Sequence, residues 1–224
     1  LRKLMTPELR REIKRTFGTL KEAEAEAFHA LRSMADPDAL ANDCMIAAEQ
    51  GCAQIDSKGR LVVLSDRIAE LPSALQVVIG VAEWFGDDLS LVDVVNVAPE
   101  HAEVTFHRYR DFHNEPFPML EARLRVGLIK QTVRYLPELP NEPPRFFVGK
   151  SDFLADKSEE QTLLDAAILA LEPWAYHKRR IDAFDLIRAI GLSGRSWNGT
   201  ELGAFFRSLP NDRIDIEAID QKIH

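Results

Sequence analysis

The middle of the chain, residues 89–136, most constrains the fold, because four segments there are rich in β-branched and aromatic residues and are separated by turn residues. The four segments read LSLVDVVNV, AEVTFHRY, LEARLRVGL and TVRYL. Consecutive strands that are joined by short turns pair in antiparallel fashion. We therefore expect a central antiparallel β-meander.

Helical patterns flank this region on both sides. Thr6 before Pro7, and Asp36 before a second proline, predict helix starts, and Ser158 with Gln161 forms a capping box. Further helices are expected at Trp174–Ile190, Gly199–Leu209 and Arg213–Ile223. The predicted fold is α+β, with N-terminal helices, a central antiparallel β-meander and a C-terminal helical subdomain. The predicted domains are residues 1–157 and 158–224.

The composition limits the possible partners and compartments. Hydrophobic residues make up 46% of the 224 residues, which is enough for a core. The net charge of −8 argues against a protein that coats nucleic acid with its whole surface, but it allows a local basic face. No apolar run approaches the roughly 20 residues of a membrane helix, so no membrane partner is expected. Two cysteines without a signal peptide favour a cytoplasmic protein, and a start at Leu1 suggests a piece of a longer one.

The segment HAEVTFHRYRDFHNEPFP, from His101 to Pro118, is the strongest candidate for metal chemistry. His107, Asp111 and His113 would share one face if the strand stayed extended, and two histidines with an aspartate suit zinc. No fourth ligand follows at a usual spacing. These residues are therefore weak metal candidates, and polar residues on a half-buried strand are the preferred interpretation.

Cofactor and catalytic motifs are missing from the sequence. Nucleotide and S-adenosylmethionine sites need clustered glycines after a strand, and no such loop is present. The segment NEPPRF differs at both flanks from the Asp/Asn-Pro-Pro-aromatic motif of adenine amino-methyltransferases. We assign no catalytic residue and expect no cofactor, and we do not expect this fragment to be an enzyme by itself.

Two clusters of basic residues are candidates for contacts with nucleic acid. Each is predicted to lie on a helix opposite an apolar stripe, as on an ordinary solvated face. The alternative is contact with phosphates, which requires no sequence motif. The clusters are Arg10, Arg11, Lys14 and Arg15, and Lys178, Arg179 and Arg180 beside His177. A helix-turn-helix with Thr200–Leu209 as its second helix is a further hypothesis.

The chain also resembles a known family through the order and spacing of four segments. These are LMTPELRREIKRTFGTLKEAEAEA, DPDALANDC, IAELPSALQVVIGVAEWFG and YRDFHNEPFPMLEARLRVGL. Over residues 4–157 they resemble the C-terminal half of the DNA phosphorothioation-associated methyltransferase-like proteins of bacteria. That family has a Tyr, an Asp-Phe pair and two prolines after one strand. The matching residues here are Tyr109, Asp111, Phe112, Pro116 and Pro118.

The resemblance implies that a methyltransferase-like domain with a glycine-rich loop precedes this region in a longer protein. Family members carry His-Arg-Lys-Glu before a Phe, of which this chain keeps Lys150 and Phe153 but has Val148, Gly149 and Ser151 at the other positions. We expect Asp111 and the prolines to fix the exit of the strand, since Asp side chains bond nearby backbone amides.

The expected function is that of a non-catalytic accessory module in bacterial DNA modification or phage defence. It would bind duplex DNA, or a DNA-modification or defence protein. One alternative is a metal-dependent nuclease or hydrolase that uses His107, Asp111 and His113. The other is a protein-interaction scaffold without nucleic acid.

Overall fold

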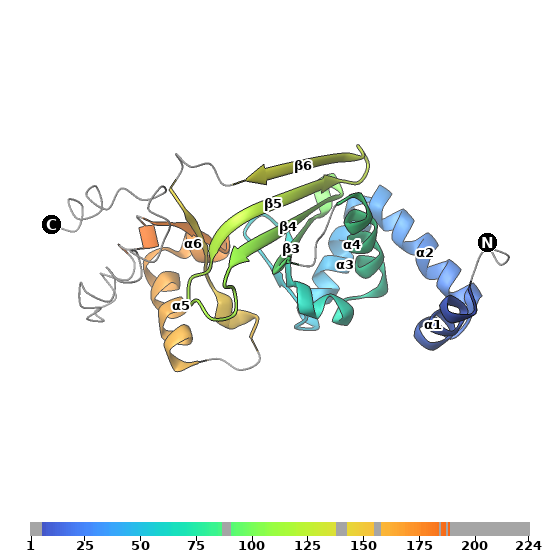
Figure 1. Ribbon diagram of the computed structural model, residues 1–224, viewed down its shortest axis with the longest axis horizontal. Coiled ribbons are helices and arrows are strands. Elements are labelled where there is room, and N and C mark those ends of the chain that lie inside the picture. Colours follow the sequence, from blue (N-terminus) through green and yellow to red (C-terminus); the bar gives the residue numbers. More distant parts are fainter. Residues whose placement is uncertain are drawn as a thin grey trace.

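The computed structural model describes residues 6–86, 91–137, 143–154, 158–183, 185–186 and 188. In these residues the fold is α+β, as predicted: helices precede and follow an antiparallel sheet along the chain (Figure 1). The helices predicted at Gly199–Leu209 and Arg213–Ile223, and with them the second helix of the helix-turn-helix hypothesis, lie outside the described residues.

Four helices lie before the meander in the sequence and two lie after it, within the described residues. The helices are α1 Pro7–Phe17, α2 Leu20–Ala35, α3 Pro37–Glu49, α4 Ser73–Phe85, α5 Glu159–Leu171 and α6 Pro173–His177, with 3₁₀ turns at Ser65–Glu70, Pro99–His101 and Lys150–Asp152. Two predicted caps are confirmed. The Asp36 Oδ1 accepts a hydrogen bond from the Asp38 amide at 3.0 Å, and the Ser158 Oγ accepts one from the Gln161 amide at 3.0 Å.

Within the described residues the sheet has eight strands, and every neighbouring pair is antiparallel. The strands are β1 Gln54–Ile55, β2 Leu61–Leu64, β3 Val94–Ala98, β4 Glu103–Arg110, β5 Met119–Gly127, β6 Thr132–Pro137, β7 Arg145–Phe147 and β8 Arg180–Asp182. Their order is β1-β2-β3-β4-β5-β7-β8, and β6 also pairs with β5. The meander β3–β6 is the one that the sequence predicted, and β7 with β8 extends it.

One face of the sheet is covered by α3 and α4 (Figure 1). Alternate side chains of β3 and β4, among them Val95, Val97 and Phe106, point to this face and are buried. They pack against apolar side chains of the helices such as Leu40 and Ile79. Because successive residues of a strand point to opposite faces, the intervening residues must face the other side.

A second apolar core lies at the other end of the sheet. Leu164 of α5 and Ala175 of α6 pack with Met119, Phe146 and Ile181 from the strands. This core combines side chains from the two predicted domains, residues 1–157 and 158–224. The helices that follow the meander therefore pack directly on its last strands.

Residues 174–190 do not form the single helix that their apolar spacing predicted. Helix α6 ends at His177, Arg179 has a φ of +56°, and β8 follows directly. In β8, Ile181 pairs with Phe146 of β7. The strand is stabilised by this distant partner, and such pairing overrides the local preference. Lys178–Arg180 therefore lie at a corner of the backbone and not along one helix face.

The sheet curls so that its two ends meet. The amide of Ser57, in the turn between β1 and β2, donates a hydrogen bond to the carbonyl of His177 at 3.0 Å. The amide of Phe147 donates to the carbonyl of Pro118 at 3.0 Å, which holds β7 beside β5. The face of the sheet away from α3 and α4 is thus concave and is bounded by the β1–β2 turn and the α6–β8 corner.

Candidate functional site

Polar side chains form the floor of the concave face. In one row, Asn96 of β3 lies opposite Thr105 of β4, which lies opposite Arg125 of β5. In the next row, His107 lies opposite Arg123. Side chains at directly opposite positions of antiparallel strands have Cβ atoms about 5 Å apart. These five side chains therefore make a continuous polar surface across three strands.

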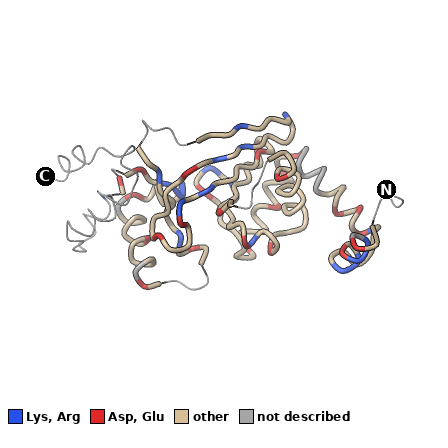
Figure 2. The backbone as a smooth tube through the Cα atoms, in the orientation of Figure 1, with Lys and Arg blue, Asp and Glu red and all other residues tan. Residues whose placement is uncertain are grey.

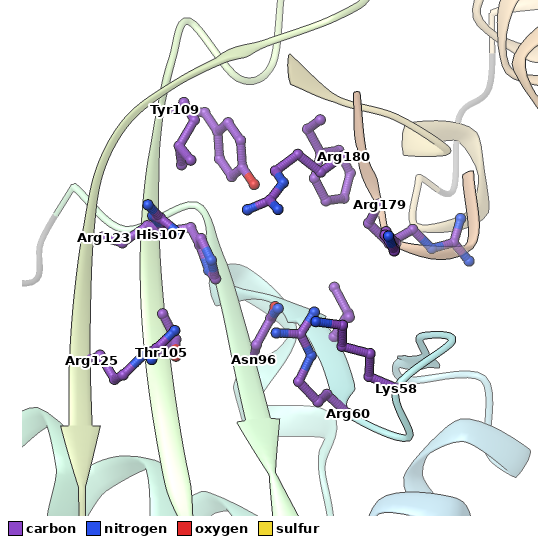
Figure 3. Close-up of a pocket in the computed structure, with 14 residues that line it drawn as sticks. Lys58, Arg60, Asn96, Thr105, His107, Tyr109, Arg123, Arg125, Arg179 and Arg180 are labelled. Carbon is purple, nitrogen blue, oxygen red and sulfur yellow. The ribbon is translucent and has the colours of Figure 1, made fainter. Parts of the chain in front are cut away.

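Two segments that are distant in sequence supply the walls. The β1–β2 turn contributes Lys58 and Arg60, and the α6–β8 corner contributes Arg179 and Arg180 (Figure 3). The corner also contributes Lys178. Floor and walls enclose a cavity volume of about 240 Å³. The hydrogen bond between Ser57 and His177 joins the two walls, so the shape of this cavity depends on the curl of the sheet.

The cavity is lined by cations. Seven of its described lining residues are Lys or Arg and none is Asp or Glu. We call this cavity the basic hollow. Its lining includes seven cations and three other polar residues: Lys58, Arg60, Arg123, Arg125, Lys178, Arg179, Arg180, Asn96, Thr105 and His107. The chain as a whole carries a net charge of −8. Figure 2 shows Lys and Arg along the strands of the sheet and, at the other end of the molecule, on α1. A local positive field of this kind attracts anions despite the acidic whole.

Carboxylates outside the lining orient three of the arginines. The Nε of Arg60 donates to Asp56 Oδ2 at 2.7 Å, and the Nε of Arg125 lies 3.2 Å from Glu103 Oε1. The Nη1 of Arg179 donates to an oxygen of Asp152 at 2.7 Å. The buried Asp56 also accepts from the backbone amides of Lys58 and Arg60, which fixes the β1–β2 turn. The arginines are held in place before any ligand binds.

Arg179 is a structural part of the wall. Its guanidinium lies over the rings of Phe153 and Tyr176, with centroid distances of 5.2 Å and 4.8 Å. In Figure 3 it is directed away from the interior of the hollow. Its contacts with aromatic rings and a carboxylate indicate that it stabilises the corner.

Two lysines at the rim are available to a ligand. Lys58 and Lys178 are exposed, and within the described residues neither forms an ion pair. The Nζ of Lys178 lies 5.0 Å from the centroid of the Trp174 ring. A charge reversal at these exposed positions should therefore change the field of the hollow, and the one contact it removes is that of Lys178 with the Trp174 ring.

His107 lies on the floor between the walls (Figure 3). Burial, followed by the charges of Arg123 and Arg60, lowers the pKa of His107 from 6.5 to about 3. The imidazole is therefore neutral at physiological pH. Among the described residues, neither its buried Nδ1 nor the buried Oδ1 of Asn96 has a hydrogen-bond partner.

The predicted turn after β4 exists, but its main hydrogen bonds differ from the prediction. Asp111 has a φ of +46°, and its backbone carbonyl accepts from the amides of Asn114 and Glu115 at 3.1 Å and 3.0 Å. Its side chain accepts from the Asn114 side chain at 2.6 Å, and no backbone amide of the described residues donates to it. The Nζ of Lys150 donates to the carbonyls of His113 and Glu115 at 2.9 Å and 3.0 Å. Lys150 thus holds the turn in place.

The other predicted turn residues anchor this segment to the sheet. The amide of Tyr109 donates to Asp93 Oδ2 at 2.7 Å. The rings of Tyr109 and Phe112 pack against Phe147, with centroid distances of 5.4 Å and 5.5 Å. Pro116 is partly exposed, and Pro118 is buried and accepts the hydrogen bond from Phe147. These residues support one end of the hollow.

The histidines and the aspartate of the metal hypothesis are not brought together. His107 faces the hollow, whereas Asp111 and His113 are exposed in the turn. The left-handed backbone at Asp111 ends the strict alternation of the strand, so the three side chains do not share a face. In the described part of the chain, no three His, Cys, Asp or Glu side chains form a group that could hold a metal ion.

The two predicted basic clusters lie at different places. The residues of the first, which are Arg10, Arg11, Lys14 and Arg15, are all exposed on α1. Helix α1 lies at the opposite end of the molecule from α5 and α6 (Figure 1). The second cluster, Lys178–Arg180, lines the hollow. Contact of either cluster with DNA stays a prediction.

The sequence prediction missed the cations of the floor and of the β1–β2 turn. Arg123 and Arg125 alternate with apolar residues in EARLRVG, and Thr105 and His107 do so in EVTFHRY. This alternation identifies a polar face on each strand. It does not show that Lys58 and Arg60 lie opposite Lys178–Arg180, because that depends on the curl of the sheet.

Comparisons with known proteins give no further indication, since no protein-family model, curated protein or solved structure matches this chain. Among the described helices, none combines the length and apolar character that crossing a membrane requires.

Proposed function

We propose that this protein binds nucleic acid through the basic hollow, with its rim cations on the phosphate backbone. One observation carries the proposal: seven Lys and Arg residues and no carboxylate line a concave face of a chain whose net charge is −8. Carboxylates outside the lining pair with three of these cations and offset only part of the repulsion among them. A polyanion that binds there offsets this repulsion.

The arrangement suits phosphates better than carboxylates of a folded protein partner. The cations lie on several strands and turns around one concave surface, so they can contact successive phosphates of a strand. Asp56 and Glu103 hold arginines of the hollow in fixed positions, which reduces the entropy lost on binding. Contacts of this kind release counterions and need no base sequence.

In the cell this module would serve bacterial DNA modification or phage defence as a non-catalytic accessory part. This role rests on the resemblance of residues 4–157 to the methyltransferase-like family, and the hollow supports the nucleic-acid contact that the role requires. The module would position a methyltransferase-like domain of a longer chain on DNA. The hollow is a better candidate for that contact than α1, because its cations converge on one cavity.

The test compares charge reversals in the two basic regions. Fluorescence anisotropy measures the affinity of the purified chain for labelled single-stranded and duplex DNA at low salt. We expect the double variant Lys58→Glu, Lys178→Glu to bind about tenfold or more weakly, a loss of roughly 1.4 kcal/mol or more. All four positions that are changed in the variant and its control are exposed, so the fold should persist.

The matched control is Arg11→Glu, Arg15→Glu on α1, which makes the same change in net charge at the other end of the molecule. We expect it to reduce the affinity much less. A wild-type chain that binds no DNA at low salt would refute the proposal and favour a protein-interaction scaffold. Equal losses in the two double variants would show that net charge, and not the hollow, determines binding.

A further inference from the structure

Two groups on the floor of the hollow differ in chemistry from the cations around them. The Oδ1 of Asn96 and the Nδ1 of His107 are buried there, and neither has a hydrogen-bond partner in the described part of the chain. The two residues are diagonal neighbours on adjacent strands, since Asn96 pairs with Thr105, two residues before His107. Buried polar groups are nearly always hydrogen-bonded in native proteins, so exceptions that gather in one cavity point to a missing ligand.

These groups do not suit a phosphate. An amide oxygen can only accept hydrogen bonds, and a phosphate diester has no hydrogen to donate. Because His107 is neutral and its ring donates a hydrogen bond to the backbone of Val94, the remaining nitrogen, Nδ1, is an acceptor without positive charge. Asn96 and His107 therefore suit a neutral ligand that donates hydrogen bonds from one edge, whereas the cations around them suit anions.

A nucleotide combines these two requirements. Its base carries donors and acceptors along an edge, and its phosphates carry the charge. The cavity of about 240 Å³ is smaller than the roughly 300–1,000 Å³ of pockets for drug-sized ligands, so it suits one such unit and not a length of duplex.

We propose that the hollow holds one unstacked nucleotide of a single strand, with its base edge hydrogen-bonded to Asn96 and His107 and its flanking phosphates at Lys58 and Lys178. This inference rests on the proposed nucleic-acid binding and specifies its substrate. A base inside an intact duplex must first be unpaired and unstacked, which costs a few kcal/mol. Single strands, gaps and mismatches are therefore the preferred ligands.

The test uses three labelled probes of equal length: a mixed-sequence single strand, a single strand made only of abasic units, and a duplex. The first two carry the same phosphates and differ only in their bases. For the wild-type chain we expect the base-containing strand to bind on the order of tenfold more tightly than the abasic strand, as one or two hydrogen bonds would give. The duplex should also bind more weakly than the base-containing strand.

Variants separate the base contacts from the phosphate contacts. Asn96→Ala and His107→Phe should bind the abasic strand as the wild type does but should lose most of the preference for bases. His107→Phe keeps a planar ring in the sheet while it removes both ring nitrogens. The controls Asn42→Ala and His101→Phe change the same residue types at exposed positions outside the hollow, and they should keep the preference. Thermal unfolding checks that each variant is folded.

The outcomes distinguish this inference from the function on which it rests. Equal wild-type affinities for the abasic and the base-containing strand would overturn the base site and leave phosphate binding intact. A full preference for bases in both Asn96→Ala and His107→Phe would also overturn it. If none of the three probes binds at low salt, both the base site and the proposed function are wrong.

Discussion

The two faces of the central sheet are built from the same strands, and neighbouring residues of a strand point to opposite faces. On the face under α3 and α4, Val95, Val97 and Phe106 are buried in a continuous apolar core. On the other face, the intervening Asn96 and His107 lie on the floor of a cationic hollow. The comparison shows how one meander carries both an apolar core and a polar hollow, because successive side chains point to opposite faces.

The largest expected effect is on the covered face. Phe106 is almost fully buried, and Phe106→Ala should lower the free energy of unfolding by about 3–5 kcal/mol, since it leaves a cavity in the core. Thr105→Ala, one residue away and facing the hollow, should cost about 1 kcal/mol or less. Urea denaturation measures both. Similar losses of unfolding free energy in the two variants would show that the two faces contribute equally to stability.

The variant Asp56→Ala tests whether the β1–β2 turn holds its cations in fixed positions before a ligand binds. Its buried carboxylate accepts hydrogen bonds from the Lys58 amide, the Arg60 amide and the Arg60 Nε. Asp56→Ala leaves these donors without their acceptor and should cost about 2 kcal/mol of stability. It should also weaken DNA binding, although it makes the chain less acidic. The control is Asp66→Ala, at an exposed position, which should change neither quantity. Stronger binding by Asp56→Ala would show that net charge matters more than the fixed geometry.

The pH dependence of stability tests the burial of His107. Its pKa is 6.5 in an ordinary environment and about 3 in the folded chain. The unfolded chain therefore binds this proton at a higher pH than the folded chain, and stability falls as the pH drops from 6.5 towards 3. The loss at about pH 5 is at most about 2 kcal/mol.

His107→Phe should remove this part of the pH dependence, and the exposed control His101→Phe should keep it. Urea denaturation at neutral pH and at about pH 5 makes the comparison. The same loss on acidification in the wild type and in His107→Phe would show that other groups are responsible.

Local patterns in the sequence predicted most of the fold. The caps at Asp36 and Ser158 and the alternation in the meander are properties of neighbouring residues, and the structure contains the corresponding helices and strands. The three-residue strand β8 could not be predicted, because it forms by pairing with β7 far away in the sequence. The hollow was missed for the same reason. Its walls meet through the hydrogen bond between Ser57 and His177, which no local pattern indicates.

The salt dependence of DNA binding tests the central claim most directly. Each phosphate contact contributes about 0.7 for a single strand, or about 0.9 for a duplex, to the slope of log affinity against log salt concentration. If Lys58 and Lys178 each contact one phosphate, their double reversal to Glu should reduce the slope by about 1.4 to 1.8. The α1 variant Arg11→Glu, Arg15→Glu should keep nearly the wild-type slope. An unchanged slope in the hollow variant, with a reduced slope in the α1 variant, would contradict the account and place the phosphate contacts on α1.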